Sequence, residues 1–156
     1  MAGYFLDSSA IGKLYHVEAG TPAVQALLEQ AEAVLYVSRL AVVEVPSAFA
    51  GKVRTGQLTV PDIELLRARF RGDLRRKVLR TVAVTAGHFR DAERLINAYG
   101  VHHRLRTLDA IQLAVATQLL RHGFVDTFVC ADKALCQVAE RVGFTVLNPE
   151  EGVSPQ

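Results

Sequence analysis

Four acidic residues stand at places in the chain where a carboxylate could take part in chemistry. Asp7 and Asp132 each come directly after a short apolar run that is typical of a β-strand. Asp109 falls in the first turn of one predicted helix, and Glu44 falls inside another. Taken singly, Asp7 and Asp132 could simply cap helices and Asp109 could complement a helix dipole. Their joint placement raises a second interpretation, in which the four side chains converge.

Glu44 is the least well explained as a solvated helix residue. The positions three and four residues away from it, which share its helix face, are apolar or small: Leu40, Ala41, Ser47 and Ala48. A carboxylate on such a face is costly to bury unless it is paired or binds a metal ion. Pro46 removes one backbone hydrogen bond, and we expect it to kink this helix.

A cluster of four carboxylates repels itself and raises its own pKa values, so it requires compensation. A divalent cation provides it, and a ligand set made only of oxygens favours Mg²⁺ or Mn²⁺ over zinc. Such an ion can lower the pKa of a bound water and hold a phosphate group. The acids therefore suggest hydrolysis of a phosphodiester.

The elements that must position these acids alternate along the chain. Apolar runs predict strands at residues 3–6, 34–37, 81–84, within 124–131 and at 144–147. Helical spacing and capping residues predict helices at 8–16, 21–32, 38–54, 59–74, 85–100, 107–123 and 132–142. Strands that alternate with long helices imply a parallel sheet covered on both faces. We therefore predict a single three-layer α/β/α domain over residues 1–147, with a central parallel sheet of four to five strands. A C-terminal tail over residues 148–156 is expected to pack loosely.

Composition and missing motifs exclude several classes of protein. The 156 residues fit one domain, and 18 Lys and Arg against 16 Asp and Glu give a net charge of only +2, which excludes a uniformly basic nucleic-acid clamp. Cys130 and Cys136 form neither a disulfide framework nor a CxxC zinc motif. The sequence has no HExxH, GxGxxG or GxxxxGK[ST] motif and no Ser–His–Asp order. We expect a cytoplasmic protein without a signal peptide or a membrane span.

Four short segments around the acids resemble the PIN-domain nucleases, and in particular the VapC-type toxins of toxin–antitoxin pairs. These segments are Phe5-Leu6-Asp7-Ser8-Ser9-Ala10, Ser38-Arg39-Leu40 leading to Glu44, Leu108-Asp109-Ala110, and Ala131-Asp132-Lys133. Each is short, but their order and spacing match over residues 4–147. The resemblance implies a PIN-like fold and a metal-dependent endoribonuclease that uses Mg²⁺ or Mn²⁺.

The resemblance also assigns roles to individual residues and implies partners. The catalytic and metal-binding residues would be Asp7, Glu44, Asp109 and Asp132, and Ser9 would support the first acid. Many relatives carry Thr or Ser two residues before the last acid, where this chain has Cys130, which puts a supporting hydrogen bond to Asp132 in question. The implied partners are an RNA substrate, a cognate antitoxin and a second copy of the chain.

Basic residues gather in two segments that could contact RNA. Seven of the 18 Lys and Arg residues fall between Arg67 and Arg80, opposed only by Asp73, and a second group precedes Asp109. They could form a solvated helix face, contact phosphates, or bind an acidic segment of an antitoxin. The candidate RNA contacts are Arg75, Arg76, Lys77, Arg104 and Arg106.

Two other functions remain open from the sequence. A receiver-like binding module shares the alternating pattern, but it needs a pair of acids after the first strand, where this chain has Phe5 and Leu6 before Asp7. A PIN domain with weak activity could serve mainly as a binding partner, although the full set of acids argues against this. The helices also carry more apolar residues than one small core requires, which agrees with a dimer: Val24, Leu27, Leu28, Ile63, Leu66 and Phe70.

Overall fold

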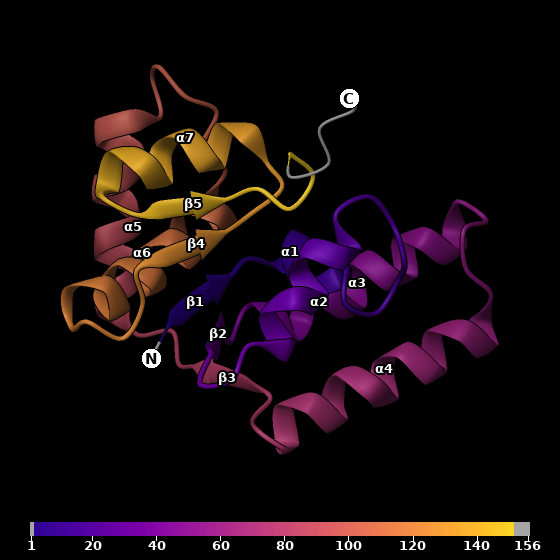
Figure 1. Cartoon of the computed structure of the whole chain (residues 1–156). Coiled ribbons are helices and arrows are strands. Elements are labelled where there is room, and N and C mark those ends of the chain that lie inside the picture. Colours follow the sequence, from indigo (N-terminus) through magenta and orange to yellow (C-terminus); the bar gives the residue numbers. More distant parts are fainter. Residues whose placement is uncertain (1, 152–156) are drawn as a thin grey trace.

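The computed structural model describes residues 2–151 and contains one parallel sheet of five strands. The strands are β1 (Gly3–Leu6), β2 (Val34–Ser38), β3 (Leu79–Val82), β4 (Thr127–Val129) and β5 (Thr145–Leu147). They lie in the order β3-β2-β1-β4-β5, and every neighbouring pair is parallel (Figure 1). This arrangement confirms the predicted fold class.

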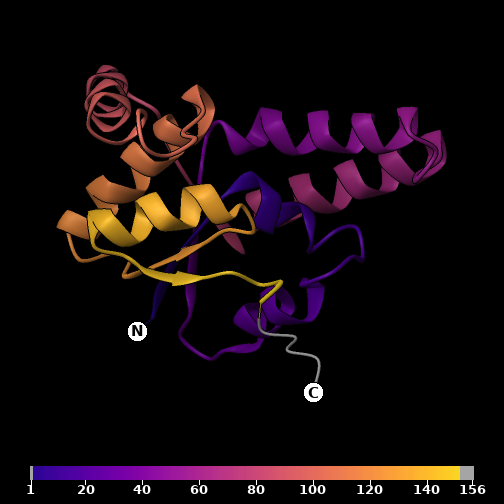
Figure 2. The same ribbon diagram turned by 90° about the horizontal axis from the view of Figure 1, so that it is seen from above.

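Helices cover both faces of the sheet and complete the three layers. They are α1 (Ser8–Gly12), α2 (Thr21–Glu29), α3 (Ala41–Arg54), α4 (Val60–Arg75), α5 (Ala86–Tyr99), α6 (Thr107–Arg121) and α7 (Lys133–Val142). Helices α1 to α4 share one apolar core with the sheet, and α6 and α7 share another on the opposite face, where α5 packs against α6. Helices α3 and α4 form a pair that extends beyond the sheet (Figures 1 and 2).

The central strands β2, β1 and β4 are mostly apolar because both of their faces are buried. In β1, Leu6 belongs to the core beneath α1 to α4, whereas its neighbour Phe5 belongs to the core beneath α6 and α7. Phe5 stacks on Phe128 of β4, with ring centroids 5.6 Å apart. This packing fixes β1 against β4, and thereby the two strand ends that carry Asp7 and Asp132.

Two of the local predictions are wrong in detail. Strand β3 begins at Leu79, two residues earlier than predicted, because the fully buried Leu79 pairs with Leu35 of β2. Ser38 ends β2 instead of capping α3, and its hydroxyl accepts a hydrogen bond from the Leu40 amide at 3.0 Å. Helix α3 runs through Pro46 as one element and ends at Arg54, as predicted.

The start of the C-terminal tail is docked, contrary to expectation. Glu150 accepts a hydrogen bond from the ammonium group of the buried Lys13 at 2.8 Å. Pro149 packs against Gly20, whose φ of +89° and close contact leave no room for a side chain. Residues 152–156 of the predicted tail lie outside the described residues.

The apolar residues predicted to exceed the needs of the core are mostly in it. Five of the six are at most 6% exposed, and only Leu28, at 41%, reaches the surface: Val24, Leu27, Leu28, Ile63, Leu66 and Phe70. They therefore do not supply a surface for a dimer. Within residues 2–151, no helix combines the length and the apolar character that a membrane crossing requires.

Candidate acidic site

The four predicted acids come from four different elements and lie at one edge of the sheet. Asp7 directly follows β1, and Asp132 follows its neighbour β4 after two residues. Glu44 lies in the first turn of α3, which leaves β2, and Asp109 lies in the first turn of α6. Because the strands are parallel, their carboxyl ends meet at the same edge, where ligands bind in open sheets of this class. We call these four residues the acidic site.

Asp7 is the buried member of the acidic site, with only 4% of its surface exposed. Its Oδ1 accepts hydrogen bonds from the Ser9 hydroxyl at 2.6 Å and from the Ala10 amide at 2.9 Å. Burial raises the pKa of Asp7 above its usual value, although these two hydrogen bonds oppose the shift and the charge of Asp132 adds to it. The residue therefore caps α1 and also presents a carboxyl group to the other acids.

The pKa of Asp109 is the clearest sign that the four acids are close together. Its pKa is raised to about 6, first by burial and then by the negative charges of its neighbours Asp7, Asp132 and Glu44. The nearby charge of Arg106 acts in the opposite direction. A bound cation would relieve this repulsion.

Glu44 is held by a residue that the sequence analysis missed. The buried Gln112 of α6 donates from Nε2 to Glu44 Oε1 and also to the Ser8 hydroxyl, the latter at 2.9 Å. Burial raises the pKa of Glu44, and the hydrogen bonds from Gln112 and Ser8 oppose that shift. A signal was present, since Gln112 lies one helical turn after Asp109 and is polar within the otherwise apolar stretch 110–116.

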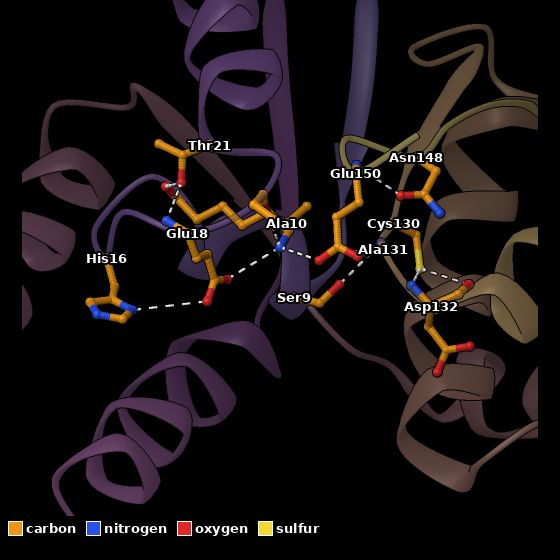
Figure 3. A network of polar contacts seen from close by, with 12 residues as sticks. Ser9, Ala10, His16, Glu18, Thr21, Cys130, Ala131, Asp132, Asn148 and Glu150 are labelled. Atoms are coloured by element: carbon orange, nitrogen blue, oxygen red, sulfur yellow. Dashed lines mark hydrogen bonds and ion pairs between the residues drawn. The ribbon is translucent and has the colours of Figure 1, made fainter. Parts of the chain in front are cut away.

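Asp132 caps α7, and Cys130 supports it from the preceding chain. Asp132 Oδ1 accepts hydrogen bonds from the amides of Ala134 at 2.9 Å and Leu135 at 3.1 Å. The Asp132 amide donates to Cys130 Sγ at 3.3 Å, and Ser9 Oγ accepts from the Ala131 amide at 3.3 Å (Figure 3). The cysteine thus keeps a hydrogen bond at this place, with sulfur as a weaker acceptor than a hydroxyl.

The thiol of Cys130 stays neutral in this environment. The hydrogen bond with Cys136, together with burial, raises the pKa of Cys130 well above its usual range. Both cysteines are buried and free, and Cys136 Sγ donates to the Cys130 carbonyl at 3.2 Å. Neither residue is placed as a nucleophile or a metal ligand.

The donor chemistry of the acidic site suits a hard divalent cation. Its side chains offer only carboxylate oxygens, and among residues 2–151 their mutual repulsion is opposed by the charge of Arg106 without a direct ion pair. In the part of the chain that the structure describes, no three His, Cys, Asp or Glu side chains lie close enough to share one metal ion. Binding of a shared ion therefore requires the carboxylates to move closer together.

The predicted RNA contacts separate into two places. Arg104 and Arg106 are exposed in the loop before α6, beside the acidic site, and Arg106 acts on the pKa of Asp109. By contrast, Arg75, Arg76 and Lys77 join α4 to the amino end of β3, at the opposite edge of the sheet from the acids.

Comparison with known proteins gives one family and several similar structures. The family model of the PIN domain matches residues 4–141. FitAcB from Neisseria gonorrhoeae is 18% identical over 94% of this chain and 97% of that chain, with a TM-score of 0.67. VapC20 from Mycobacterium tuberculosis, described as a sarcin-ricin loop cleaving toxin, is 17% identical over 91% and 96%, with a TM-score of 0.64. VapBC2 from Rickettsia felis, solved with a DNA fragment from its promoter, is 10% identical over 93% and 97%, with a TM-score of 0.59. No curated protein matches the sequence.

Proposed function

The chain belongs to the PIN domain family, and from this premise we propose that it is a metal-dependent endoribonuclease and the toxin of a toxin–antitoxin pair. The observation that carries the proposal is the gathering of Asp7, Glu44, Asp109 and Asp132 at the carboxyl edge of the sheet, which raises the pKa of Asp109. Carboxylates that repel one another in this way are suited to Mg²⁺ or Mn²⁺.

Within this proposal, the residues of the chain arrange the reactants. In Asp7 and Asp132 one carboxylate oxygen is held by a backbone amide at the start of α1 or α7, so each side chain needs only a small movement to share an ion. When bound, Mg²⁺ or Mn²⁺ would lower the pKa of a water and offset charge on the phosphate oxygens. Asp109, which lies among the other three acids, would share in holding the ion. In the reaction, the water oxygen bonds to phosphorus as the ester P–O bond breaks, the water gives up a proton, and the leaving oxygen gains one.

The similar structures support the choice of substrate and partner. One carries the name of a toxin that cleaves the sarcin-ricin loop, and another is named as a toxin–antitoxin complex from Klebsiella pneumoniae. From these names we extend an RNA substrate and a cognate antitoxin to this chain, and we further propose the homodimer and the cytoplasmic location expected from the sequence. Arg104 and Arg106, beside the acids, are the proposed contacts to the RNA backbone.

RNA cleavage by the purified protein tests the proposal. We expect cleavage with Mg²⁺ or Mn²⁺ that EDTA abolishes, and a loss of at least about a hundredfold in Asp7→Asn and Asp109→Asn. Asp126→Asn is the matched control, since Asp126 is an exposed acid just before β4, at the opposite end of that strand from Asp132. Cleavage that persists in EDTA or in both site variants would refute the proposal.

The receiver-like alternative does not fit the sheet. Receiver domains have the strand order 2-1-3-4-5, whereas this sheet has β1 between β2 and β4 and places β3 at an edge. If the chain is a PIN domain that mainly binds a partner, the experiment above should give soluble protein without cleavage activity.

A further inference from the structure

Gln112 is a buried amide that joins three elements at the acidic site. It is 1% exposed and belongs to α6, the helix that also carries Asp109. Its Nε2 donates to Ser8 Oγ on α1 at 2.9 Å and to the Glu44 carboxylate on α3. The Gln112 side chain therefore connects α1 and α3, which follow β1 and β2, to α6.

The fold alone does not account for an amide at this position. Gln112 Oε1 is buried without a hydrogen-bond partner, and among residues 2–151 the only other side-chain atom in that state is His16 Nδ1. A buried acceptor without a partner lowers stability, and the flanking positions of α6 are apolar. A methionine of similar length would avoid this loss, so the hydrogen bonds of Gln112 must serve something other than packing.

Those hydrogen bonds act on Glu44, which has no bond from a backbone amide. Asp7 and Asp132 accept from backbone amides, whereas Glu44 is bonded by the side chains of Gln112 and Ser8. The Glu44 side chain has three rotatable bonds, and the charge of Asp7 disfavours its ionised form in this place. Without a donor, the carboxylate is free to turn toward solvent.

We propose that Gln112 is a positioning residue, which holds the Glu44 carboxylate in the acidic site through its bridge to Ser8 and so prepares the site for a divalent cation. This inference rests on the proposed function. Hydrogen bonds to metal-binding carboxylates commonly set metal affinity, and losing one weakens binding about 10- to 100-fold.

Two glutamines on the same helix provide a matched pair of variants. Gln112→Met keeps the length of the side chain and removes the donor. Gln118→Met makes the same change one and a half turns later, where Gln118 bonds His88 of α5 instead of an acid. Ser8→Ala removes the anchor of the bridge and leaves Gln112 in place; Gln112→Leu replaces Gln112→Met if the latter does not fold.

Mn²⁺ binding, measured from the spin-resonance signal of the free ion, is the first readout. We expect Gln112→Met to weaken Mn²⁺ binding at least about tenfold while its melting temperature stays equal or rises, because the unpaired acceptor is gone. RNA cleavage should fall at low Mn²⁺ and recover partly at high Mn²⁺, and Gln118→Met should bind Mn²⁺ as the wild type does. Because both residues act on the Glu44 carboxylate and bond each other, Ser8→Ala should weaken binding less in Gln112→Met than in the wild type.

Crystal structures of the metal-free wild type and Gln112→Met give the second readout. We expect the Glu44 carboxylate to leave its place or to occupy several conformers in the variant. Wild-type Mn²⁺ affinity in Gln112→Met, or an unmoved Glu44, would overturn the inference. If the wild type neither binds Mn²⁺ nor cleaves RNA, the proposed function fails, and the position of Glu44 in the metal-free variant still decides whether Gln112 positions it.

Discussion

At the scale of single residues, the raised pKa of Asp109 predicts how stability depends on pH. The folded pKa of about 6 exceeds the usual 3.8, so between these values the folded state binds more protons than the unfolded state. The free energy of unfolding of the metal-free protein should therefore fall as the pH rises from about 4 to 6. Asp109→Asn should reduce this fall, to which the raised pKa values of Asp7 and Glu44 still contribute. It should raise stability at pH 7 by roughly 1 kcal/mol, since solvent screens part of the repulsion.

Urea unfolding in EDTA at pH 4.5 and pH 7 measures this effect. Asp126→Asn, at an exposed acid outside the acidic site, should leave the pH dependence unchanged. An Asp109→Asn variant with the same pH dependence as the wild type would show that Asp109 titrates normally.

The Ser9 hydroxyl links Asp7 to the segment that carries Asp132, so we expect its removal to affect RNA cleavage. Its Oγ donates to Asp7 at 2.6 Å and accepts from the Ala131 amide at 3.3 Å. Ser9→Ala should lower RNA cleavage about tenfold with little change in melting temperature, because Ser9 is exposed. Ser9→Thr keeps the hydroxyl and should retain most of the activity; an equal loss in both variants would assign the effect to side-chain size.

At the scale of elements, the sequence predicted most of the fold because its signals were local. Strand runs, the Thr59 capping box of α4 and the acids at strand ends could all be recognised within a few residues. What was missed depends on partners far away in sequence. Gln112 acquires its role only when α1 and α3 meet α6, and β3 shifts by two residues because Leu79 is buried beside Leu35.

The contact between Lys13 and the C-terminal segment leads to a prediction about stability. Local sequence patterns could not reveal it, because the two partners lie far apart in the chain. Lys13, directly after α1, is 3% exposed and bonds both Glu18 and Glu150, so α1 and the C-terminal segment share one buried charge. Lys13→Met should destabilise the protein by about 1–3 kcal/mol, since two acids lose their partner while staying partly hydrated. Lys52→Met, which removes a more exposed partner of Glu18, should cost about 1 kcal/mol or less in urea unfolding. Equal losses in the two variants would show that burial of Lys13 is unimportant.

At the scale of the whole molecule, the net charge of +2 conceals a separation of charge. Four of the acidic residues gather in the acidic site, so the rest of the surface is more basic than the total suggests. Because the strands are parallel, the two pairs of arginines lie at opposite edges of the sheet. Arg104 and Arg106 lie beside the acids, whereas Arg75 and Arg76 lie near the amino ends of the strands. An RNA whose scissile bond lies at the acidic site can contact Arg104 and Arg106 directly. To contact Arg75 and Arg76 as well, the RNA would have to cross to the opposite edge of the sheet.

RNA binding in EDTA, which separates affinity from cleavage, tests this division. Arg104→Ala and Arg106→Ala should each weaken binding and lower the dependence of log K on log salt by about 0.7, the share of one single-strand phosphate contact. Arg75→Ala should change neither, because Arg75 is exposed on the last turn of α4 at the opposite edge. If Arg75→Ala instead lowers the salt dependence as much as Arg106→Ala does, the RNA must run from the acidic site across β3 to the end of α4. Such a path would make the arginines of α4 a second part of the RNA-binding surface.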